Sequence, residues 1–206
     1  MKPLVIAQRL QQGLDASRAA DWLAPLLLRL YLAPVMWMAG WNKAMGFADT
    51  VEWFGNADWG LGLPFPTLMA GLAIGAELGG AISLLLGLGL RWMTLPMMAT
   101  MLVAIFTVHW HNGWLAISEG MGLFATERTL EATAALARAK ELLMQSGEYE
   151  ELTRHGSLVV LNNGVEFAVT YLVMLLTLFF TGAGRYLSLD YWLRRRLDAS
   201  AAVKSA

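Results

Sequence analysis

The sequence predicts an all-α integral membrane protein, a bundle of four transmembrane helices with a helical insertion between the third and the fourth. Its 206 residues are 57% hydrophobic and 15% charged, whereas soluble domains are about half apolar and a quarter charged. The hydrophobic residues form long blocks, as in membrane spans. Lys and Arg are also distributed unevenly among the connecting segments, which is typical of polytopic membrane proteins.

Four apolar blocks define the expected spans, and together they form one membrane domain over residues 1–206. The first covers residues 22–45 and the second covers 66–90, which starts at a proline. The third covers 92–111, so close to the second that the two must form an antiparallel hairpin. The fourth covers 164–181. The second span also has small residues at intervals of four, Gly71, Gly75 and Gly79, with Gly80 next to the last of them. Such small residues allow a neighbouring helix to approach closely.

Two further segments differ in composition from the spans. Residues 113–158 are rich in Glu, and 129–145 within them has the charge periodicity of an amphipathic helix. This insertion is too short for a substantial core of its own. The first 21 residues carry too many charges for a signal peptide, and we interpret them as a short interfacial helix. A frayed tail is the alternative interpretation.

The positions of Lys and Arg predict the orientation. One side of the membrane has Lys2, Arg9, Arg18, Arg91 and the Arg-rich tail, whereas the segments on the other side are acidic. Positive residues favour the cytoplasm. We therefore expect a multi-pass protein of the bacterial inner membrane with both termini cytoplasmic. The insertion then faces the periplasm, or the outside of a Gram-positive cell.

The composition argues against several functions. The chain has no cysteine, so it has no disulfide, thiol redox centre or Cys-based metal site. A net charge of −1 without a basic tract argues against nucleic-acid binding. No nucleotide-binding or hydrolase motif is present. Haem is not expected, because both histidines near the membrane lie on one helix.

Five stretches resemble the DoxX family of four-helix bacterial membrane proteins, and they occur in the family's order. They are LLLRLYLAPVMWMAGWNKAMGF, GLPFP, AGLAIGAELGGAISLLLGLGLRW, MLVAIFTVHWHNGW and GAGRYLSLD. The resemblance covers all four spans, and the insertion at 113–158 is outside the family's core pattern. It implies a link to quinone-coupled redox chemistry, because one relative is a subunit of thiosulfate:quinone oxidoreductase. Other relatives are membrane partners of detoxifying or thiol-handling enzymes.

Two ionisable residues lie inside the expected spans, where charges are costly and usually face the bundle interior. Glu77 is near the middle of the second span, and Arg29 is about seven residues into the first. A buried Glu77–Arg29 ion pair that fixes the packing of the helices is one interpretation. The other is that Glu77 relays protons or binds a quinone or metal.

Four residues from three spans are expected at one depth near the periplasmic face: Lys43, His109, His111 and Glu166. Two imidazoles and carboxylates suit a divalent metal, for which His109, His111 and Glu166 are the candidate ligands. The same groups suit a quinone head group, which needs hydrogen-bond donors and a proton source. Each residue also has an ordinary explanation: helix capping for the histidines, dipole complementarity for Glu166 and snorkelling for Lys43. His109 is expected to lie further inward than His111.

Two functions are consistent with these features. The chain could be the membrane subunit of a quinone-coupled oxidoreductase, binding quinone, or less favourably a divalent metal, and taking electrons from a protein partner. It could instead be a non-catalytic scaffold that anchors a redox or detoxifying enzyme through its Glu-rich insertion or its Arg-rich tail. A permease is less favoured, because four spans leave little room for a pathway, although the glycine-lined second span is compatible with a homo-oligomer.

Overall fold

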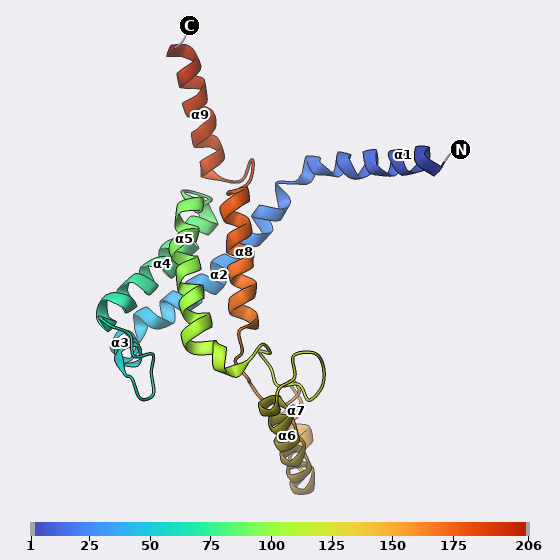
Figure 1. Cartoon of the computed structure of the whole chain (residues 1–206), viewed down its shortest axis with the longest axis vertical. Helices are drawn as coiled ribbons and strands as arrows, with labels where there is room; N and C mark the ends of the chain where they lie inside the picture. The colour runs from blue at the N-terminus through green and yellow to red at the C-terminus, as the bar shows by residue number, and fades with distance from the viewer. Residues whose placement is uncertain (1–2, 205–206) are drawn as a thin grey trace. The chain divides into compact units, whose positions relative to one another are not determined.

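The computed structural model describes residues 3–204, and this part of the chain is helical (Figure 1). Among the described residues, the isolated β pairing is a single antiparallel bridge between Ile117 and Leu161. The helices are α1 (Pro3–Ala16), α2 (Leu23–Met45), α3 (Phe47–Gly55), α4 (Pro66–Leu86), α5 (Leu90–Val103), α6 (Glu127–Ser146), α7 (Tyr149–Thr153), α8 (Glu166–Thr181) and α9 (Leu189–Lys204).

The chain folds into two compact units. The first unit contains residues 1–100 and 173–206, and the second unit contains 101–172. The single membrane domain expected from the sequence stays a prediction, and each unit is described by itself below.

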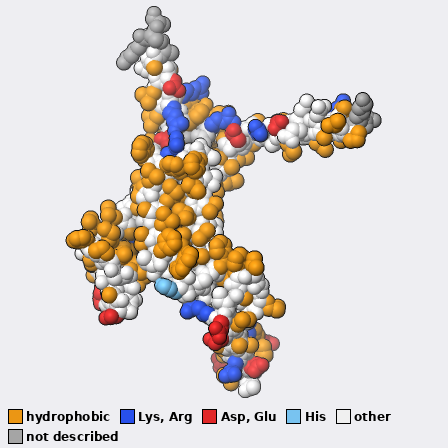
Figure 2. All heavy atoms as spheres, in the orientation of Figure 1, with side chains coloured by type: hydrophobic (Ala, Val, Ile, Leu, Met, Phe, Trp, Pro, Cys, Tyr) orange, Lys and Arg blue, Asp and Glu red, His pale blue; other side chains and the backbone are white. Residues whose placement is uncertain are grey.

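Three helical segments are long and apolar enough to cross a membrane: α2, α4 and the continuous helical stretch Leu90–Asn112. They have 23, 21 and 23 residues. At about 1.5 Å per residue, even the shortest matches a hydrocarbon core of about 30 Å. The fourth expected span is also an apolar helix, α8, but its 16 residues reach only about 24 Å. Figure 2 shows hydrophobic side chains over much of the visible face of the helices.

The second span ends four residues earlier than expected, at Leu86. Gly87 and Gly89 follow it with φ of 62° and 60°, a left-handed conformation that glycine adopts without strain and that ends a helix. After this link α5 begins at Leu90. The expected interhelical contact forms only at the end of the glycine series: a Cβ at Gly80 would lie 2.7 Å from Met97 Cγ on α5.

The core of the first unit lies where α2 packs on α4. Leu32 and Met36 from α2 and Leu84 from α4 are at most 1% exposed. Residues 46–65 lie between the first two expected spans and so were expected to form a loop, but they contain a helix, α3. It is amphipathic, and its single buried residue, Phe54, faces inward.

The second unit begins at the end of the third span. Residues Ala104–His109 form a π-helical turn, and Trp110–Asn112 form a 3-10 turn. Ile105 then packs with Val165 and Ala168 in a small core. The predicted amphipathic helix of the insertion is confirmed as α6, which extends the expected range by two residues at its start and one at its end.

Candidate functional site

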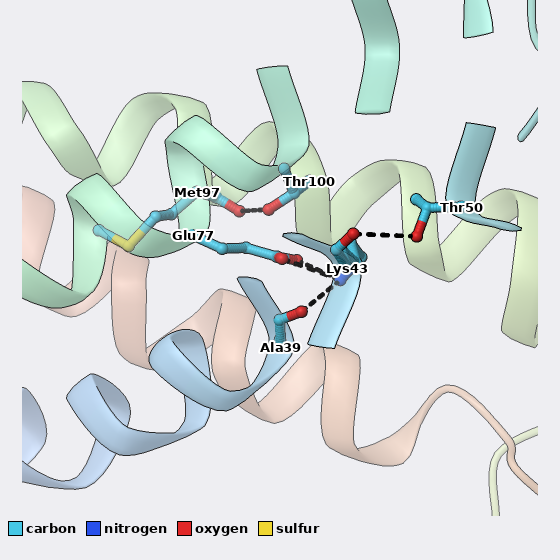
Figure 3. Close-up of polar contacts among 6 residues, drawn as sticks. All are labelled: Ala39, Lys43, Thr50, Glu77, Met97 and Thr100. Atoms are coloured by element: carbon cyan, nitrogen blue, oxygen red, sulfur yellow. Dashed lines mark hydrogen bonds and ion pairs between the residues drawn. The ribbon is translucent and has the colours of Figure 1, made fainter. Parts of the chain in front are cut away.

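A buried ion pair joins α2 to α4 in the first unit (Figure 3). Lys43 is in the last turn of α2, and Glu77 is in the middle of α4. Lys43 Nζ donates to both carboxylate oxygens of Glu77 at 2.8 Å. Glu77 is 3% exposed, so its carboxylate is shielded from the medium outside the protein. A buried carboxylate needs hydrogen-bond donors from the protein, and Lys43 supplies them.

The sequence around Lys43 explains why the two helices approach so closely at this point. Gly40 lies one turn before Lys43, and a Cβ there would be 2.9 Å from Leu78 Cγ and 3.0 Å from Glu77 Cβ. Any larger residue at position 40 would push α4 away. The hydroxyl of Thr50 donates to the Lys43 carbonyl at 3.3 Å, which ties the end of α2 to α3.

The geometry of the pair leaves one direction open. The third interaction of Lys43 Nζ is a long bond of 3.4 Å to the Ala39 carbonyl. The side chain of Lys43 is 26% exposed, whereas that of Glu77 is 5% exposed. A ligand oxygen can therefore reach Lys43 in place of the weak Ala39 contact, while the carboxylate stays buried behind it. An ammonium and a carboxylate in direct contact can also exchange a proton.

The predicted ion pair between Arg29 and Glu77 is wrong, because Glu77 pairs with Lys43. Arg29 is 1% exposed, and among the described residues its hydrogen bonds go to backbone carbonyls. The acceptors are Leu84 at 2.7 Å, Leu85 at 3.0 Å, Ala183 at 2.9 Å and Leu187 at 2.9 Å. The carbonyls of Leu84 and Leu85 belong to the last turn of α4, where no amide of the same helix is available to them. The forked guanidinium fits these acceptors, and depth counted along the sequence could not reveal this.

Asp190 is a second structural residue that sequence reasoning missed. Its carboxylate oxygens accept from the Gly89 and Leu90 amides at 2.8 and 3.2 Å. These amides are at the start of α5, where donors lack partners and a negative charge is favourable. Asp190 therefore fixes α9 to the link between α4 and α5. The signal was available, since Asp190 closes one of the stretches on which the resemblance rests.

The DoxX family model matches residues 24–110. Residues 24–110 are a DoxX domain. Comparisons with curated proteins and with solved structures found no match to the chain.

The match places the predicted site residues in two groups. Arg29, Lys43, Glu77 and His109 are inside the DoxX domain. His111 and Glu166 are outside it, as are the insertion and α8. The candidate site is the Lys43–Glu77 pair, whose two helices pack together in the first unit. It therefore lies wholly within the DoxX domain.

The two histidines at the end of the DoxX domain differ in exposure as expected. His109 is half-buried, and His111 is exposed. His109 Nδ1 forms a hydrogen bond of 2.9 Å with the Asn163 carbonyl, which Asn112 Nδ2 also contacts at 3.1 Å. Asn163 has a φ of 58° and precedes α8. His109 therefore fastens the chain where it turns into α8.

The predicted metal ligands do not form a metal site. No group of three or more His, Asp or Glu side chains that could hold a metal ion is present within residues 3–204. Glu166 instead accepts from the Ala116 amide at 2.9 Å, because the insertion returns beside its own start. Lys43 belongs to the other unit, so its expected convergence with His109 and Glu166 stays a prediction.

Asn162 joins the end of the insertion to its start. It is 1% exposed, and its Nδ2 donates to the carbonyls of Asn112 and Leu115 at 2.8 and 2.6 Å. Its Oδ1 accepts from Arg128 Nε at 3.1 Å, which fastens α6 to the same point. An asparagine in a polar loop has no pattern that predicts this role.

Proposed function

We propose that this DoxX-domain protein is the membrane subunit of a quinone-coupled oxidoreductase, and that Lys43 and Glu77 bind the quinone head group. The observation that supports the proposal is the ion pair between two candidate membrane spans. Of its two residues, Glu77 is buried and Lys43 remains accessible. Ionisable residues at such a depth are costly and mark ligand or proton pathways. The resemblance to the DoxX family points to the same chemistry.

The roles of the two residues follow from their donors and acceptors. A quinone carbonyl oxygen is an acceptor and takes a hydrogen bond from Lys43 Nζ. Reduction of the quinone to quinol takes two electrons and two protons. Lys43 delivers one of the two protons to the reduced oxygen and is reprotonated through Glu77, the hydrogen-bond partner of Nζ among the described residues that can carry a proton. Glu77 then takes a proton back from water, and the second proton of the quinol comes directly from water. The electrons come from a redox centre on a partner protein, because the chain has no thiol centre of its own.

The proposal includes the arrangement in the bacterial inner membrane. In it α8 is the fourth span, and a span this short is accommodated by local thinning of the bilayer. Both termini are then cytoplasmic, with α1 at the membrane surface and the insertion on the periplasmic side, as the Lys and Arg positions favour. The free small residues Gly71 and Gly75, which meet nothing within 4 Å, are compatible with a homo-oligomer.

The test is the affinity of the detergent-purified protein for a quinone analogue. Lys43→Met and Glu77→Gln should each weaken binding about tenfold or more, the worth of one charge-assisted hydrogen bond. Lys140→Met and Glu141→Gln on α6 are the matched controls and should leave the affinity unchanged. The exchanged variant Lys43→Glu/Glu77→Lys keeps an ion pair between the helices but moves the ammonium to the buried position. It should fold and bind poorly.

The outcomes separate a binding site from a structural pair. If the pair only holds the helices together, the exchanged variant regains the quinone affinity that the single variants lose. Unchanged quinone affinity in folded Lys43→Met and Glu77→Gln protein rejects the proposed site.

A scaffold is the second candidate function, and one observation favours it. Among the 20 residues of α6 only Thr129 is buried, which leaves a long helix with an unoccupied surface. In this case the surface binds the partner enzyme, and deleting residues 127–151 abolishes a partner pull-down while Lys43→Met and Glu77→Gln leave it intact.

A further inference from the structure

A hollow of about 440 Å³ opens in the first unit at the end where α4 passes into α5. Its wall includes Arg91 and Trp92 from the start of α5, Phe179 from α8 and Arg194 from α9. The volume falls within the range of small-molecule sites, about 300–1,000 Å³. The hollow is separate from the Lys43–Glu77 site, with which it shares no residue.

The two guanidinium groups in this wall are free to bind an anion. Within the described part of the chain, Arg91 uses only its Nε, which donates to the Phe179 carbonyl at 2.8 Å, and its guanidinium carbon lies 5.4 Å from the centre of the Phe179 ring. This holds the side chain in place and leaves both Nη atoms available. The side chain of Arg194 has no ion pair or hydrogen bond with any residue in the described range 3–204.

The single carboxylate in the wall, Asp190, offsets only part of the charge of the two guanidinium groups. Both oxygens of Asp190 accept amide hydrogens from Gly89 and Leu90, so neither arginine is paired with it. Figure 2 shows Lys and Arg side chains gathered near the base of α9. Two guanidinium groups against one carboxylate leave the hollow with a net positive charge, and its free donors come from α5 and α9.

The position of the hollow identifies its ligand. It lies at the ends of two candidate spans, Pro66–Leu86 and Leu90–Asn112. Trp92 is 79% exposed, as tryptophans of the membrane interface are. Phosphate oxygens of lipid head groups lie at this level, and forked guanidinium groups bind them in pairs. Basic pockets between membrane helices recognise anionic lipids in this way.

We propose that this hollow binds the phosphodiester of an anionic phospholipid, with Arg91 and Arg194 as its two ligands and Trp92 against the glycerol and upper acyl region. Zwitterionic lipids share the phosphate, but their cationic head group is repelled by the two guanidinium groups of the hollow. The pocket therefore selects anionic lipids. A bound lipid also joins α5 to α9 and so stabilises the start of the C-terminal helix.

The test measures binding of short-chain phosphatidylglycerol to the full-length protein in uncharged detergent by native mass spectrometry. The lipid should bind at least tenfold more tightly than phosphatidylcholine of the same chain length. Arg194→Gln should weaken phosphatidylglycerol binding about tenfold, because one charge-assisted hydrogen bond is lost. Arg196→Gln, on the same helix but outside the hollow, is the matched control and should have no effect without a charged membrane surface.

Further variants and a competition experiment decide the proposal. Arg91→Gln should weaken phosphatidylglycerol binding as much as Arg194→Gln does. Arg91 also contacts Phe179, so its replacement could disturb the fold. Arg194 has no such contact among the described residues, and its variant therefore separates a loss of binding from misfolding. Arg194→Lys keeps the charge and should recover part of the affinity, since an ammonium lacks the fork. Equal effects of Arg194→Gln and Arg196→Gln, or equal binding of the two lipids, would overturn the proposal. Competition by inorganic phosphate at the lipid's own concentration would assign the hollow to a soluble phosphate and overturn it too.

Discussion

Replacing Arg29 by methionine tests the arrangement of charges inside the DoxX domain. The substitution keeps most of the side-chain length and removes the guanidinium. Four backbone carbonyls then lose their donor, at distances of 2.7 to 3.0 Å in the intact protein. Arg29 is 1% exposed, so water does not replace the lost bonds without rearrangement of the helix ends.

The magnitude follows from two opposing terms. Hydrogen bonds from a charged donor contribute about 1.5–3 kcal/mol each, and removing the buried charge recovers several kcal/mol of desolvation. For four bonds the balance is a loss of about 3–5 kcal/mol in the free energy of unfolding. Arg29→Lys should lose less, because an ammonium still serves some of the acceptors but cannot span all four.

The assay is unfolding of the purified protein by a denaturing detergent, followed by circular dichroism. A double-mutant cycle makes it decisive. Arg29 and Glu77 share no hydrogen-bond partner among the described residues, so the effects of Arg29→Met and Glu77→Gln should add to within about 0.5 kcal/mol. Lys43→Met and Glu77→Gln should instead show a coupling of about 1–3 kcal/mol. A coupling above about 1 kcal/mol between Arg29 and Glu77 would refute the pairing described here.

The remaining predictions concern helix packing and topology. Gly80→Ala should cost about 1–3 kcal/mol, because its Cβ would collide with Met97. Gly75→Ala is the matched control, and with open space around it it should be neutral or stabilising by about 0.5–1 kcal/mol; equal effects in detergent unfolding would refute the assigned interface. Reporter fusions after residue 206 and within 129–145 should report opposite compartments, and the same compartment for both rejects the four-span topology.

The helices were predictable because their signals are local. Long apolar blocks, a proline at a helix start and glycines at helix ends determine α2, α4 and the helical stretch Leu90–Asn112 to within a few residues. The helix α3 was missed because nine residues with three aromatics and two acids also suit an interfacial loop. The segment is stabilised as a helix because Phe54 packs inward. A local sequence pattern does not predict this contact.

The partners of the charged residues could not be predicted in the same way. Depth counted along each span placed Arg29 within reach of Glu77, but an arginine near helix ends has carbonyl acceptors that a sequence does not display. Lys43 seemed a snorkelling residue at the end of its span. The glycine one turn earlier brings α4 close and directs Lys43 to Glu77 instead. His109 similarly bonds to a loop carbonyl 54 residues away.

Arg29 and Lys43 are cations on one helix, yet their surroundings give them different chemistry. Arginine remains charged in proteins, and all the described bonds of Arg29 are to carbonyls that never accept a proton. It can hold helices but cannot take part in proton transfer. Lys43 faces the one partner that can take up a proton, Glu77, and is the more accessible of the two. The proton-coupled chemistry that we propose therefore falls to the Lys43–Glu77 pair within the DoxX domain, and Arg29 supplies the fixed framework that holds α2 and α4 together around it.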